Sequence, residues 1–232
     1  MPQIDLSSLR ALPLFRDANP RVVAELFELV QLRRFSKQAR PIKEGEIPDF
    51  LHIVTEGTVE LFANHNNQET TIDVVRAGVP LALAAVISGA ECLYSVRTLV
   101  PAQMLLLPAE AVRAACARDA AFAQAALGEL ADRYGGSIRA LKNMKLRTSA
   151  ERLANWILQA VTARGDGADG QVIELICDKR TIASHLGMTP ENFSRNMAML
   201  AKYGVRNSGR DIFIDNPAAL AQFAKPNALL DG

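Results

Sequence analysis

The stretch Lys179–Ala198, KRTIASHLGMTPENFSRNMA, has the pattern of two short amphipathic helices joined by a tight turn. Ala183 stands where two such helices must pack closely, and Gly187 tolerates the positive φ that the turn requires. The apolar residues fall on one side of each helix, which leaves the other side polar: Ile182, Leu186, Met188, Phe193 and Met197. This pattern predicts a DNA-contacting helix-turn-helix.

The second of these helices has a defined start. Thr189 is an N-cap residue, Pro190 fits the first helical position, and Glu191 lies near the positive end of the helix dipole. Base contacts are predicted for Glu191, Ser194 and Arg195. Arg195 can donate to guanine O6 and N7, Glu191 can accept from cytosine N4, and Ser194 suits a base or a phosphate. The alternative is a solvated face with an intrahelical Glu191–Arg195 ion pair.

Positive charge is concentrated around this motif. The chain of 232 residues has a formal net charge of only +1, yet residues 139–210 hold 12 Lys and Arg against 6 Asp and Glu. Such a local excess is expected of a DNA-contacting module joined to a neutral or acidic one. Candidates for contact with phosphates are Lys179, Arg180, Thr189, Lys202, Arg206 and Arg210.

The segments around the motif extend it to a winged helix-turn-helix. Leu153–Val161 has a helical pattern, residues 163–170 have a linker composition, and Val172–Ile176 is a candidate strand. Val205–Ile214 has two short alternating runs around Asn207-Ser208-Gly209, which predicts a β-hairpin in the position of a wing.

The first half of the chain predicts a different architecture. Leu9–Phe35 has helical periodicity, after which short alternating runs separated by Gly, Asn and Pro predict an antiparallel β-sandwich or roll: Ile53–Ala63, Thr70–Val75, Tyr94–Val100 and Ala102–Pro108. The predicted fold class is therefore α+β, with an N-terminal antiparallel β-roll, a long helix and a C-terminal winged helix-turn-helix.

The long helix is predicted over Asp119–Lys145, with Asp119 as its cap and Gly135-Gly136 as a place of close approach or a kink. Its apolar stripe either packs on its own sheet or, the preferred interpretation, pairs with a second copy as a two-stranded coiled coil. The predicted dimer interface consists of Leu127, Leu130, Tyr134, Ile138 and Leu141. The predicted domains are 1–118 (β-roll sensor), 119–147 (dimerisation helix) and 148–232 (winged helix-turn-helix).

Three dispersed cysteines, no signal peptide and no apolar run long enough to span a bilayer predict a cytoplasmic protein with free thiols. An enzyme is not favoured, because we find no nucleophile–base order, no metal-spaced His/Cys set and no phosphate-cradling glycine loop. A sensor or interaction protein of this fold without DNA binding is a further hypothesis, but the basic excess and the three base-contacting residues argue against it.

The segments FLHIVTEGTVELF (Phe50–Phe62) and IASHLGMTPENFSR (Ile182–Arg195) resemble the β-roll hairpin and the recognition unit of the CRP/FNR family of bacterial transcription regulators. The resemblance extends over essentially the whole chain. It implies a homodimer that binds promoter DNA and, as an activator, RNA polymerase. The E-x-x-S-R pattern of Glu191, Ser194 and Arg195 is similar to FNR-type members that read TTGAT-like half-sites, and FtrB-like activators are the group it resembles most.

The resemblance also narrows the set of ligands that the β-roll could sense. Cyclic AMP-binding members carry a Gly-Glu pair and a phosphate-binding Arg, whereas here Pro80-Leu81 and Cys92 fall near those positions within Arg76–Leu99. An iron–sulfur cluster needs an N-terminal cysteine cluster, and residues 1–91 contain no cysteine. The sequence therefore argues against both ligands.

Several signals remain open. A haem has the candidate ligands Pro2, His52 and Cys92. A small apolar effector would be bound by Leu81, Leu83, Cys92, Arg97 and Leu127. The signal could also be thiol oxidation at Cys92 or Cys177, or the protein could act without any effector.

Overall fold

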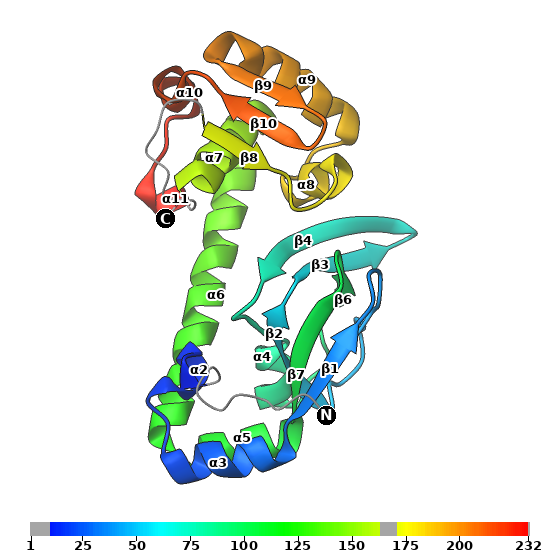
Figure 1. Ribbon diagram of the computed structural model, residues 1–232, viewed down its shortest axis with the longest axis vertical. Coiled ribbons are helices and arrows are strands. Elements are labelled where there is room, and N and C mark those ends of the chain that lie inside the picture. Colours follow the sequence, from blue (N-terminus) through cyan, green and yellow to red (C-terminus); the bar gives the residue numbers. More distant parts are fainter. Residues whose placement is uncertain (1–9, 163–170, 232) are drawn as a thin grey trace. The chain divides into compact units, whose positions relative to one another are not determined.

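The computed structural model describes residues 10–162 and 171–231 (Figure 1). The chain forms two compact units, which divide within one long helix between Tyr134 and Gly135. In the described ranges, no helix is both long and apolar enough to cross a membrane.

The first unit opens with two helices, α2 (Pro13–Arg16) and α3 (Pro20–Leu29), and the Asn19 side chain caps α3 by accepting from the Arg21 N–H. The next segment, β1 (Gln31–Phe35), is a strand, so the prediction of a helix through Phe35 is wrong at its end. The backbone turns extended at Val30, and β1 then pairs antiparallel with β7 (Ala102–Pro108). Pairing with a strand distant in sequence outweighs the local helical periodicity.

Two antiparallel sheets form the predicted β-roll. One has the order β1-β7-β2-β5 and the other β4-β3-β6. Their remaining strands are β2 (Phe50–Glu56), β3 (Thr58–His65), β4 (Gln68–Arg76), β5 (Pro80–Leu81) and β6 (Ser95–Thr98). Gly57 joins β2 to β3 at φ +91°, and a Cβ there would lie 2.7 Å from the Pro101 carbonyl oxygen. Only glycine fits this turn.

Alternation along β2 divides the side chains between two cores. Leu51 and Ile53 pack with α3, α5 (Ala109–Arg118) and the start of the long helix. Val54 faces the other way, into a core between the two sheets that also contains Val59 and Leu61 of β3. The apolar run after β5 forms the short helix α4 (Leu83–Ser88).

The long helix α6 (Ala120–Leu146) begins as predicted, and it continues through Gly135-Gly136 as one helix. Asp119 Oδ1 accepts from the Ala121 N–H (3.0 Å) and its Oδ2 from the Asn19 N–H (2.6 Å). Within the first unit, Arg133 of α6 forms an ion pair with Asp73 of β4 (3.2 Å).

The second unit contains the predicted winged helix-turn-helix. A capping box of Thr148 and Glu151 starts α7 (Ser149–Thr162). The helix-turn-helix is α8 (Lys179–His185) followed by α9 (Pro190–Leu200), and a 3₁₀ turn, η1 (Ala201–Tyr203), leads into the wing. The wing hairpin, β9 (Val205–Ser208) and β10 (Asp211–Ile214), pairs further with β8 (Gln171–Glu174).

Two further helices, α10 (Pro217–Ala224) and α11 (Ala228–Asp231), follow the wing and have no counterpart in the sequence predictions. α10 packs mainly on α7. α11 is attached to the last turns of α6, because Lys142 Nζ and Asn143 Nδ2 donate to the carbonyls of Leu229 (2.9 Å) and Leu230 (2.8 Å).

Candidate nucleic-acid interface

The turn between α8 and α9 has the predicted conformation. Gly187 adopts φ +62°, Ala183 is fully buried, and the Met188 N–H donates to the Ala183 carbonyl at 2.9 Å. The predictions for Ala183 and Gly187 are confirmed.

An arginine outside the motif holds this turn. Arg152 of α7 donates through Nε to the Leu186 carbonyl (2.8 Å) and through its guanidinium to the Gly187 carbonyl (3.2 Å). It also donates to the carbonyl of Arg147, the residue that follows α6 (2.7 Å). Sequence analysis missed Arg152, because its partners are backbone atoms up to 35 residues away. Its contacts make it a positioning residue for the turn.

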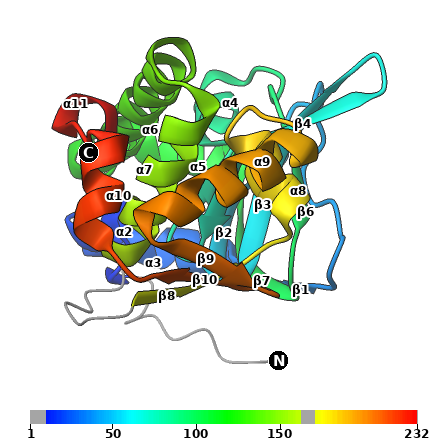
Figure 2. The same ribbon diagram turned by 90° about the horizontal axis from the view of Figure 1, so that it is seen from above.

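Helix α9 presents its polar side to solvent. Thr189 Oγ1 accepts from the Asn192 N–H (3.2 Å), as predicted for an N-cap, while Phe193, Met197 and Leu200 are buried. Glu191, Ser194 and Arg195 are all exposed. Since they are three and four residues apart, they share one side of the first two turns. Figure 2 looks onto this helix, with the wing strands beside it.

The polar side chains of α9 are oriented by neighbours within the helix. Ser194 Oγ donates to the Pro190 carbonyl (3.0 Å), and the Arg195 guanidinium donates to Asn192 Oδ1. Asn192 was not among the predicted site residues. The Glu191 backbone N–H and the Thr189 hydroxyl lower the pKa of the Glu191 carboxyl, with a further contribution from Arg195. Glu191 is thus held as an ionised acceptor.

The candidates for phosphate contact fall into two groups. Arg180 and Lys202 are exposed, and Lys179, at the start of α8, is half-buried. Arg206 instead forms an ion pair with Asp215 (2.8 Å) and lies over the Phe213 ring, and Arg210 donates to the Leu175 carbonyl (3.0 Å). The Arg206–Asp215 pair partly neutralises the wing.

Large apolar side chains are exposed along α6. The exposed fractions of Leu127, Tyr134 and Leu141 are 61%, 70% and 51%, and that of Ile138 is 40%. Leu130 is half-buried against the core of the first unit. The stripe is therefore only partly covered by the rest of the chain.

The predicted effector-pocket residues differ in their burial. Leu81, Leu83 and Cys92 are buried core residues, while Leu127 is exposed. Arg97 is already bound by two carboxylates, Glu60 Oε2 (2.6 Å) and Glu69 Oε1 (2.7 Å). Burial raises the pKa of the Cys92 thiol, which disfavours the reactive thiolate. Cys177 is buried as well.

Among the described residues, the two proposed haem ligands His52 and Cys92 do not fit a haem. Pro2 lies outside the described residues. His52 lines a pocket of about 220 Å³, which is smaller than a porphyrin, and Cys92 is 2% exposed. Among the described residues, no group of three or more His, Cys, Asp or Glu side chains has the arrangement of a metal site.

Each of the two structural units matches a known domain family. A cyclic nucleotide-binding domain model matches residues 32–119, and a Crp-like helix-turn-helix domain model matches residues 151–223. A comparison of the sequence with curated proteins gives no match.

Solved structures show the same fold at low sequence identity. FixK2 from Bradyrhizobium japonicum has a TM-score of 0.73 and 19% identity over 86% of this chain and 99% of its own. A CooA double mutant from Carboxydothermus hydrogenoformans has a TM-score of 0.73 and 17% identity, over 86% of this chain and 90% of its own. The c-di-GMP responsive regulator CLP from Xanthomonas campestris has a TM-score of 0.71 and 13% identity, over 84% of this chain and 99% of its own.

The two units together define a DNA-binding regulator of transcription, with a β-roll of the cyclic nucleotide-binding type joined to a winged helix-turn-helix. The chain belongs to the CRP/FNR family.

Proposed function

We propose that the chain is a homodimeric, cytoplasmic transcription regulator that reads palindromic DNA with TTGAT-like half-sites. The observation that supports this most strongly is the exposed side of α9, where Glu191, Ser194 and Arg195 lie over the first two turns. The FNR-type assignment, with the FtrB-like group and RNA polymerase as a partner, depends on the resemblance of these residues.

Each base-contacting residue has a role that its chemistry supports. Arg195 donates to guanine, the ionised Glu191 accepts from cytosine, and Ser194 exchanges its bond to the Pro190 carbonyl for a base or phosphate. Lys179, Arg180, Thr189 and Lys202 contact phosphates and set the register of the helix on the duplex. Arg206 and Arg210 each keep guanidinium N–H groups beyond those bound to Asp215 and to the Leu175 carbonyl, so each can still donate to a phosphate.

Each predicted domain has its own role in this proposal. Residues 1–118 bind or sense the signal, residues 119–147 form the dimer interface, and residues 148–232 bind DNA. The signal is not cyclic AMP. Glu60 and Glu69 already neutralise Arg97, the arginine of this segment that a cyclic phosphate would need. Titration calorimetry with cyclic AMP should give no saturable heat, and submillimolar binding would refute this part of the proposal.

The DNA contact is tested by fluorescence anisotropy with a duplex carrying a TTGAT palindrome and with a scrambled duplex. Arg195→Ala should cost about 1–3 kcal/mol of specific binding, because one bidentate base contact is lost. Arg76→Ala, on β4, removes the same charge from an exposed site and should bind like the wild type. Equal affinities of the wild type and Arg195→Ala for the palindrome would exclude Arg195 as a base-contacting residue.

A further inference from the structure

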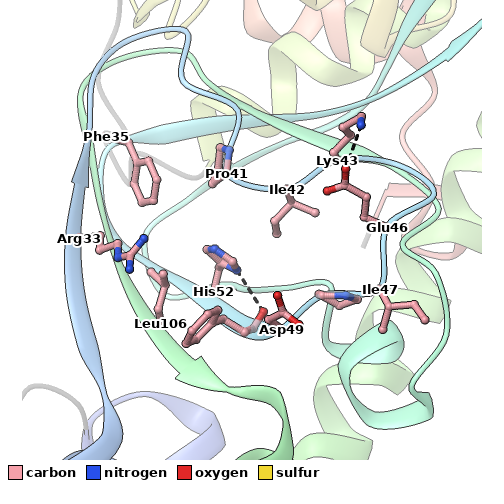
Figure 3. Close-up of a pocket in the computed structure, with 12 residues that line it drawn as sticks. Arg33, Phe35, Pro41, Ile42, Lys43, Glu46, Ile47, Asp49, His52 and Leu106 are labelled. Carbon is pink, nitrogen blue, oxygen red and sulfur yellow. Dashed lines mark hydrogen bonds and ion pairs between the residues drawn. The ribbon is translucent and has the colours of Figure 1, made fainter.

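The β-roll contains a pocket outside the predicted effector residues, at one end of the core between the two sheets (Figure 3). Its volume is about 220 Å³. The lining comes from β1, the loop of residues 41–49, β2 and β7. Seven of its twelve lining residues are apolar: Phe35, Pro41, Ile42, Ile47, Pro48, Phe50 and Leu106.

Of the polar residues that line this pocket, His52 is the buried one. His52 of β2 lies opposite Leu106 in the sheet register and is only 7% exposed. Its Nδ1 lies 3.1 Å from the Phe50 carbonyl oxygen. A carbonyl only accepts, so Nδ1 carries the hydrogen and Nε2 keeps its lone pair. Within the described residues, Nε2 has no hydrogen-bond partner.

The charged residues of the lining balance, with Arg33 and Lys43 against Glu46 and Asp49, so the site as a whole favours a neutral ligand. Burial lowers the pKa of His52 to about 4, and the nearby Arg33 lowers it further, so the imidazole is neutral at pH 7. Arg33 extends toward His52 in Figure 3. Glu46 and Asp49 at the rim repel anions, and Lys43 is paired with Glu46 at 2.8 Å. An apolar molecule with a hydrogen-bond donor suits these surroundings better than a carboxylate.

The pocket is preformed. Backbone hydrogen bonds hold its loop to the following segment: the Gly45 N–H donates to the Cys92 carbonyl (2.8 Å), and the Cys92 N–H donates to the Glu46 carbonyl (2.9 Å). The Val96 N–H donates to the Ile42 carbonyl (2.9 Å). A ligand therefore loses little free energy in ordering the site.

We propose that this pocket binds a small neutral aromatic alcohol of the size of phenol. The ring packs on Phe35 and Phe50, and the hydroxyl donates to His52 Nε2. An apolar cavity of about 150 Å³ is known to hold benzene, so the present pocket has room for one substituted ring. This site goes beyond the proposed DNA-binding function, and its test uses no DNA, so either can fail without the other.

The test uses the full chain, with phenol, toluene and benzoate as probes. Long-range ¹H–¹⁵N NMR resolves the imidazole nitrogens of the three histidines in the chain. Phenol should bind saturably and shift the His52 Nε2 resonance. It should bind about five- to tenfold more tightly than toluene, because it gains one hydrogen bond. Benzoate should bind more weakly than phenol.

Two variants assign the effect to this histidine. In His52→Phe, the affinities for phenol and toluene should become equal within about twofold. His65→Phe removes an exposed imidazole and should keep the preference for phenol. If His52→Phe does not fold, the wild-type measurements decide alone. Equal wild-type affinities for phenol and toluene, non-saturating phenol binding or an unmoved Nε2 resonance would overturn the proposal.

Discussion

At the scale of the residue, His52 couples the stability of the β-roll to pH. Its pKa is about 4 in the folded chain, mainly because burial disfavours the charged imidazole, against an ordinary value of 6.5. The unfolded chain therefore binds more protons between these values, so stability rises with pH in this window and falls as pH drops from 6.5 toward 4.

The expected loss is about 2 kcal/mol of unfolding free energy from this residue between pH 7 and pH 5. Urea unfolding at both pH values measures it, with His52→Gln as the variant that cannot titrate. His65→Gln, at an exposed site, should keep the wild-type pH dependence. An unchanged pH dependence in His52→Gln would show that His52 does not carry the effect.

At the scale of the element, the turn between α8 and α9 depends on Gly187 for two reasons. Its φ of +62° strains any L side chain, and a Cβ there would overlap the flexible end of the Met144 side chain, at the end of α6. Gly209 of the wing has a similar φ of +60°, but a Cβ at that position would have no atom within 4 Å. A substitution at Gly209 therefore introduces backbone strain alone, whereas one at Gly187 introduces backbone strain and steric overlap.

Gly209→Ala should cost about 1–2 kcal/mol from backbone strain alone. Gly187→Ala should cost more, because Met144 must also move, and the excess should shrink when it is combined with Met144→Ala. Urea unfolding of the four variants, including Met144→Ala alone, measures this coupling. Identical losses for Gly187→Ala and Gly209→Ala would mean that Met144 yields at no cost.

The attachment of α11 gives a second test at this scale. Asp231 accepts from both guanidinium nitrogens of Arg147, and the side chains of this pair are only 11% and 6% exposed. The Arg206–Asp215 pair of the wing is 60% and 48% exposed. Asp231→Asn should therefore cost about 3 kcal/mol, and Asp215→Asn less than about 1 kcal/mol, in unfolding free energy. Similar losses for the two variants would contradict this difference.

The elements differ in how far the sequence predicts them. Thr189, Pro190 and Gly187 act within a few residues, so the boundaries of the helix-turn-helix follow from local chemistry. β1 was missed because its pairing with β7 joins residues about 70 apart, as in Gln31↔Leu106. The contacts of Arg152 and the pocket at His52 were missed for the same reason: both depend on backbone segments that only the fold brings together.

At the scale of the whole molecule, the exposed apolar stripe of α6 is the surface on which we propose that two copies pair. Tyr134 and Leu141 are seven residues apart and are 70% and 51% exposed, which matches successive positions of a coiled-coil seam. Asp132 lies nine residues before Leu141, two and a half helical turns away, and so on the opposite side of α6.

Leu141→Lys should therefore dissociate the dimer, because it places a charge in the apolar seam, while Asp132→Lys should leave the dimer intact. Light scattering after size exclusion measures the mass against the 25.2 kDa of one chain. The monomeric variant should also lose most of its preference for a TTGAT palindrome over a single half-site, since two joined α9 helices no longer bind together. A Leu141→Lys variant that remains dimeric would exclude this stripe as the interface, whereas a monomer that keeps the full palindrome preference would separate dimerisation from DNA reading.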